Sequence, residues 1–112
     1  LITLLSLMAL ASFALNARST GVVNQIEFNP NPMEKYTTIT IILNQPASIG
    51  VNVETETGTV IKTLYWGQAE GQIQFGWDRL ADNGTTVPSG SYVLVVNFDT
   101  RYTSIKKTLI LK

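Results

Sequence analysis

The chain has 112 residues, of which 45% are apolar and 14% are charged, and its formal net charge is zero; this is enough for one domain. It contains no cysteine and no histidine, which excludes a cysteine nucleophile, a Ser-His-Asp triad, a disulfide framework and the usual zinc ligands. The balanced and scattered charge also excludes the basic footprint of a nucleic-acid binder. We therefore expect a non-enzymatic protein without a cofactor, whose partners are proteins or copies of itself and not nucleic acid.

Residues 1–17 carry no charge and are continuously apolar, which predicts a hydrophobic N-terminal helix. The run lies at the lower limit of membrane-spanning length, about 17 residues, and equally fits the apolar core of a signal peptide. The triplets Ser12-Phe13-Ala14 and Leu15-Asn16-Ala17 both end on the small residue that a signal peptidase requires.

Two interpretations of this segment stay open. In the first, residues 1–17 are a signal peptide that is removed on export. In the second, they are retained, either as the only point of membrane contact or as the helical core of a homopolymeric, pilin-like extracellular filament. The absence of an acidic residue near the start, where Leu5 stands, weighs against a type IV pilin.

From residue 22 onward the hydrophobic period changes to two, which is typical of β-strands. The segment 22–112 is predicted to form one antiparallel, Ig-like β-sandwich of about seven strands, because turn residues recur at short intervals. The predicted strands are Val22–Asn29, Tyr36–Asn44, Ser48–Glu56, Val60–Tyr65, Gly71–Trp77, Ser91–Phe98 and Thr103–Leu111.

A long loop follows the predicted strand that ends at Trp77. Asp82-Asn83-Gly84 is a turn in which Asn and Gly tolerate positive φ. Pro88 then fixes φ just before Ser89-Gly90 starts the next strand. We expect Trp77 and Tyr92 to pack at the two ends of this loop, over the edge of the sandwich.

Two stretches of the chain carry more specific motifs. One is Phe28-Asn29-Pro30-Asn31-Pro32, and the other runs from Phe75-Gly76-Trp77-Asp78 through Asp82-Asn83-Gly84 to Val87-Pro88-Ser89-Gly90-Ser91-Tyr92. Both resemble a known family, the Ig-like domain of the bacterial flagellar hook-capping protein. The resemblance covers about Ile26–Lys112, and it departs from the family at Arg79, where glycine is usual. The motif positions to which it assigns a structural role are Pro30, Asn31, Pro32, Trp77, Asp78, Asn83, Gly84, Pro88, Gly90 and Tyr92.

A second group, the C-terminal sorting domains of a Bacteroidetes-type secretion system, is similar in its Pro-Asn-Pro opening and its Gly-x-Tyr strand. The Trp-Asp and Asp-Asn-Gly loop favours the hook-capping group. Both resemblances imply an exported structural or interaction module of the cell envelope, located outside the cell, at the cell surface or in the periplasm.

Two sets of side chains are candidates for a further role. Asp78, Asp82 and Asn83 are close enough in sequence to offer oxygen ligands to Ca²⁺, but Asx-turns account for the same residues more simply.

Tyr65 and Trp66 are adjacent, so in a strand they point to opposite faces and at least one is expected near the surface. They either form a candidate interaction surface or both cap the ends of the sandwich, and the sequence leaves these two interpretations open.

Overall fold

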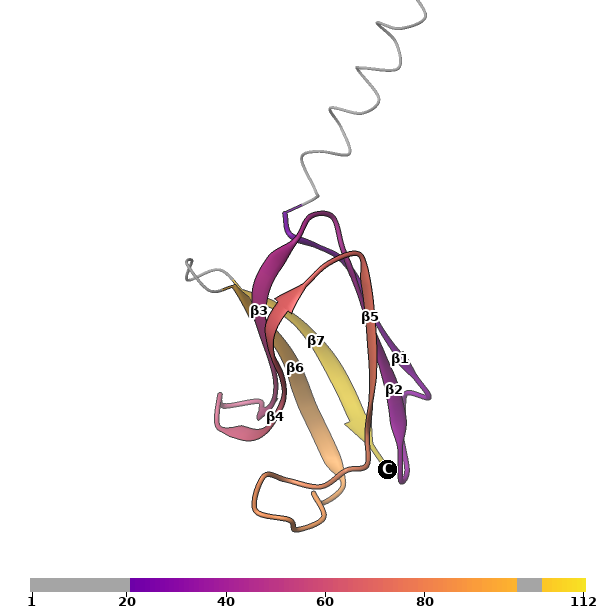
Figure 1. The fold of residues 1–112 in the computed structure, drawn as a ribbon. Helices are drawn as coiled ribbons and strands as arrows, with labels where there is room; N and C mark the ends of the chain where they lie inside the picture. The colour runs from indigo at the N-terminus through magenta and orange to yellow at the C-terminus, as the bar shows by residue number, and fades with distance from the viewer. Residues whose placement is uncertain (1–20, 99–103) are drawn as a thin grey trace, which may run out of the picture.

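The computed structural model describes residues 21–98 and 104–112, which form seven strands in two antiparallel sheets (Figure 1). The first sheet has the order β1–β2–β5, with β1 at Val23–Asn29, β2 at Thr37–Leu43 and β5 at Gln72–Trp77. The second has the order β4–β3–β6–β7, with β4 at Val60–Ala69, β3 at Ala47–Thr55, β6 at Gly90–Phe98 and β7 at Ser104–Leu111. The predicted all-β sandwich is confirmed. The helix predicted over residues 1–17 lies outside the described residues.

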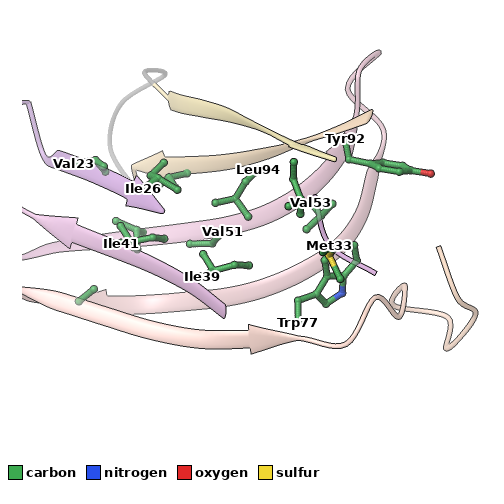
Figure 2. Close-up of a cluster of buried hydrophobic side chains, with 14 of the residues drawn as sticks. Val23, Ile26, Met33, Ile39, Ile41, Val51, Val53, Trp77, Tyr92 and Leu94 are labelled. Atoms are coloured by element: carbon green, nitrogen blue, oxygen red, sulfur yellow. The ribbon is translucent and has the colours of Figure 1, made fainter. Parts of the chain in front are cut away.

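The strands form where the sequence alternates, and their inward residues make one core. Ile39 and Ile41 of β2 are fully buried against Val51 of β3 and Leu94 of β6. Figure 2 shows these side chains between the two sheets. The intervening positions on β2 are occupied by Thr38, Thr40 and Ile42, whose branched side chains suit a pleated surface. Alternation therefore assigns the inner face correctly along these strands.

Strand β4 is longer than the alternation predicts, and a bulge explains the difference. The register pairs Val51 with Tyr65 and Asn52 with Thr63, so that Leu64 is an extra residue on β4. Leu64 and Tyr65 consequently both pack against the core. A bulge re-aims the side chains that follow it, and the strand continues to Ala69 instead of ending at Tyr65.

The sheets are joined by connections that cross from one layer to the other. The β5–β6 connection, residues 78–89, lies at the same end of the sandwich as the C-terminus (Figure 1). The first strand begins at the opposite end. Among the described residues, no helix is long and apolar enough to span a membrane.

Candidate functional site

The β5–β6 loop is built around the side chain of Trp77, which is only 1% exposed. Its indole Nε1 donates to the backbone oxygen of Leu80 at 2.9 Å. Leu80 in turn forms an isolated antiparallel bridge with Thr86, and Val87 is buried. Trp77, which the sequence places at one end of the loop, is therefore buried and also hydrogen-bonded to the loop backbone.

Arg79 holds the two ends of this loop together. Its Nε donates to the carbonyl of Val87 at 2.8 Å, one Nη to the carbonyl of Glu34 at 2.6 Å, and the other Nη to Ser89 Oγ at 3.3 Å. Its φ is +69°, a left-handed conformation that glycine adopts without strain. The position at which the sequence departs from the family's glycine is thus one where glycine suits the backbone. In this chain three side-chain hydrogen bonds stabilise the arginine instead.

Asp82 fastens the loop to the outer edge of β4. Its carboxylate oxygens accept the amide of Thr63 at 3.2 and 3.3 Å, and its own amide donates to the carbonyl of Ile61 at 3.0 Å. Lys62 Nζ lies 3.7 Å from the same carboxylate. Backbone groups that an edge strand would leave unpaired are therefore satisfied by the loop.

The three side chains of the calcium hypothesis each have a partner within the protein. Asp78 Oδ1 accepts the amide of Leu80, and Asn83 Oδ1 accepts both the amide and the hydroxyl of Thr85. These are Asx-turn contacts, and Asp82 is directed toward β4. Within 21–98 and 104–112 there is no group of three or more histidine, cysteine, aspartate or glutamate residues that could hold a metal. The calcium site stays a prediction that the described geometry does not favour.

The Pro-Asn-Pro segment closes a different edge of the sandwich. Asn31 Oδ1 accepts the amide of Ile110 on β7 at 3.0 Å. The amide of Met33 then donates to the carbonyl of Ile110, and Lys112 donates to the carbonyl of Met33. Met33 itself is fully buried in the core (Figure 2). The motif thus covers the C-terminal half of β7.

The same segment is also hydrogen-bonded to the first residue of β2. The peptide bonds preceding Pro30 and Pro32 are both cis. The carbonyl of Pro30 accepts a hydrogen bond from the buried hydroxyl of Thr37 at 2.7 Å. That bond satisfies the one buried polar side chain among the described residues, as burial requires.

Tyr92, near the start of β6, forms a hydrogen bond back to the loop. Its hydroxyl donates to the carbonyl of Pro88 at 2.7 Å, and its ring is 8% exposed. Gly90 has φ +149° and Gly84 has φ +87°. A tyrosine near a strand start that bonds to backbone a few residues upstream is the tyrosine corner of Ig-like domains.

The two adjacent aromatics on β4 separate as expected. Tyr65 stacks on Phe75, with ring centroids 6.1 Å apart and an interplanar angle of 8°, and its hydroxyl donates to the carbonyl of Gln68. Trp66 is 73% exposed on the outer face of its sheet, over Gly50. The structure therefore leaves Trp66 available to a partner and packs Tyr65, partly buried, against the core. An interaction role for either residue stays a prediction.

Sequence reasoning missed the anchoring roles of Arg79, Asp82 and Met33. Asp82 and Met33 act through partners more than fifteen residues away, and Arg79 through partners 8, 10 and 45 residues away, and no local pattern shows such pairings. The one signal was Arg79 itself, because a long cationic side chain at a position suited to glycine needs compensating contacts.

The two layers, the loop with its tryptophan and the tyrosine corner define an Ig-like β-sandwich. The chain belongs to the FlgD Ig-like domain family, whose model matches residues 13–101. The resemblance read from the motifs is confirmed, although the matched span begins and ends earlier than 26–112. No curated protein matches the chain.

Two solved structures similar to this chain come from Porphyromonas gingivalis. Dimeric latent PorU matches with a TM-score of 0.62 and 24% identity over 77% of this chain and 9% of that one. PorZ, described as an essential bacterial surface component of the type-IX secretion system, matches with a TM-score of 0.54 and 19% identity over 78% of this chain and 11% of that one. The chain thus spans about a tenth of each protein, and at these identities the likeness shows the fold.

Proposed function

We propose that this protein is a non-catalytic, exported Ig-like module of the cell envelope that works through contacts with other proteins. The observation that carries the proposal is that the residues of the family motif have a structural role. Their side chains in the described residues form hydrogen bonds to the protein's own backbone or fill its core, as Trp77, Asn31 and Tyr92 do. Such a motif supports a scaffold, and function then lies in the surfaces that the scaffold presents.

The comparisons support the envelope part of the proposal. PorZ is a surface component of a secretion system, and an envelope location suits a chain whose residues 1–17 have the composition of an export signal. No buried side-chain nitrogen or oxygen in the described part lacks a hydrogen-bond partner, so the buried polar side chains there contribute to the structure of the scaffold.

The deciding experiment is the intact mass and N-terminal sequence of the protein from its native source, combined with cell fractionation. A start at Leu15 or Arg18, in the surface or extracellular fraction, supports a released module. A cytosolic protein would contradict the proposal.

The same experiment separates the alternative, a filament subunit. A start at Leu1 in material that sediments as polymers would support a retained helical core, for which the uncharged run of residues 1–17 is the favouring observation. Electron microscopy of the sedimented fraction would then show whether filaments are present.

A further inference from the structure

The edge strands β1 and β7 lie beside each other, and only part of β7 is covered. The Pro-Asn-Pro segment satisfies the backbone of Ile110 and Lys112 in its C-terminal half. At residues 104–107 the arrangement differs. There, the described residues show one hydrogen bond between the two strands, from Lys107 Nζ to the carbonyl oxygen of Ile26 at 2.5 Å.

A groove lies along this uncovered stretch, with a volume of about 280 Å³. Its lining residues are Val23, Asn24, Gln25, Ile26, Ile105, Lys106 and Lys107. Val23 and Ile26 are buried and give the groove an apolar component. We call it the β1/β7 groove.

Ile105 shows that the groove opens onto the core. It pairs with Val96, and cross-strand partners share a face of the sheet. Val96 is completely buried, yet Ile105 is 42% exposed. A side chain in a core-facing register that stays this exposed marks a length of core that the described residues do not cover.

Lys107 is at the next core-facing position on β7, where it pairs with the fully buried Leu94. Its ammonium group reaches across the groove to the carbonyl of Ile26 and lies 5.7 Å from the centroid of the Phe28 ring. An inward-pointing charge on an edge strand discourages pairing with other strands. Here it also occupies a carbonyl that an added strand would use.

The charge of the groove decides which strand can enter. Two of its lining residues are lysines and none is acidic. A second copy of the chain would bring the same lysines against each other, which disfavours self-association. A carboxylate on an incoming strand would instead form a charge-assisted hydrogen bond with Lys107 and free the carbonyl of Ile26 for a backbone amide.

We propose that the β1/β7 groove binds an extended segment of a partner protein whose groove-facing side chains are apolar except for one carboxylate. The segment adds a strand to the free edge of β1. Its apolar side chains contact Val23, Ile26 and Ile105, and a carboxylate pairs with Lys107. This deepens the proposed role as an interaction module and rests on it in taking the partner to be a protein.

The test uses the 112-residue chain and a capped peptide of about the length of a typical strand. Its groove-facing positions are valine except for one glutamate, and its intervening positions are threonine. A matched peptide carries lysine in place of glutamate. By fluorescence anisotropy the acidic peptide should bind at least about tenfold more tightly than the basic one. Amide chemical shifts should change at residues 23–28 and 104–107. Lys107→Glu should reverse the preference, and Lys35→Glu, an equal charge change at an exposed loop residue, should leave it unaltered.

Four results would overturn the proposal. They are equal binding of both peptides, an unchanged preference in Lys107→Glu, binding that appears only after residues 1–17 are deleted, and self-association that Lys107→Glu alters. The third would assign the groove to the chain's own N-terminal segment and the fourth to a second copy. None depends on where the protein resides, so a cytosolic location would defeat the export proposal and leave this result standing.

Discussion

At the scale of single residues, Arg79 joins a strained backbone to a set of hydrogen bonds. Its positive φ costs about 1–2 kcal/mol for a residue with a Cβ atom, and its guanidinium bonds to Val87, Glu34 and Ser89 offset that cost. Arg79→Ala keeps the strain and loses the bonds, so we expect about 2–3 kcal/mol of destabilisation. Arg79→Gly relieves the strain and should be about 1 kcal/mol more stable than the alanine variant. Urea unfolding followed by far-UV circular dichroism measures both. Equal stability of the two variants would contradict the argument.

The hydroxyl of Tyr92 gives a second test at this scale. Tyr92→Phe removes the part-buried hydrogen bond to the carbonyl of Pro88 while keeping the ring. The expected loss is about 1 kcal/mol in the free energy of unfolding. Tyr36→Phe is the matched control, because Tyr36 is 54% exposed and its hydroxyl can bond to water. Calorimetric melting of both variants should show a lower Tm for Tyr92→Phe alone.

At the scale of elements, Gly50 and Trp66 form a coupled pair across β3 and β4. A Cβ atom added at Gly50 would lie 2.8 Å from Cε3 of the Trp66 ring and 3.0 Å from Cζ3, with no other atom within 4 Å. In a Trp66→Ala background, Gly50→Ala should therefore stabilise by about 0.5–1 kcal/mol, since alanine restricts the unfolded chain. With Trp66 present the ring must move, and we expect the gain to disappear. A double-mutant cycle from urea denaturation measures the coupling. The same effect of Gly50→Ala in both backgrounds would show that the ring does not constrain this position.

The strands themselves were predictable from the sequence, because each needs only local alternation and a turn. Thr37–Leu43 and Gln72–Trp77 each differ from the predicted segments by a residue at one or both ends. The end of β4 was not predictable, since the bulge at Leu64 makes two successive residues face the core and breaks the alternation. The inward register of Lys107 was also beyond prediction. Its neighbour across the sheet, Leu94, is set by strand pairing and not by local sequence.

The candidate site likewise has features that the local sequence predicts and features that it does not. Turn chemistry predicted that Asp82, Asn83 and Gly84 reverse the chain, and Gly84 does have positive φ. The hydrogen bonds that Asp82 accepts from β4 and Asn31 accepts from β7 join segments 19 and 79 residues apart. Contacts of this range depend on how the two sheets stack. Composition and period contain no information about that stacking.

At the scale of the whole molecule, both sheets contribute to one core (Figure 2), and the two tryptophans report on opposite environments. We expect a single cooperative transition, because neither sheet has a separate core with which to stay folded. In Trp66→Phe the remaining Trp77 is 1% exposed. Its fluorescence should resist acrylamide quenching in the native state and shift to longer wavelength on unfolding, at the same urea concentration as the circular dichroism. In Trp77→Phe the remaining Trp66 is 73% exposed and should be quenched almost equally in both states. If the Trp77 signal changed before the circular dichroism, the β5–β6 loop would open independently of the sandwich. The hydrogen bonds from Arg79 and Asp82 argue against that outcome, because they tie the loop to the segment before β2 and to β4.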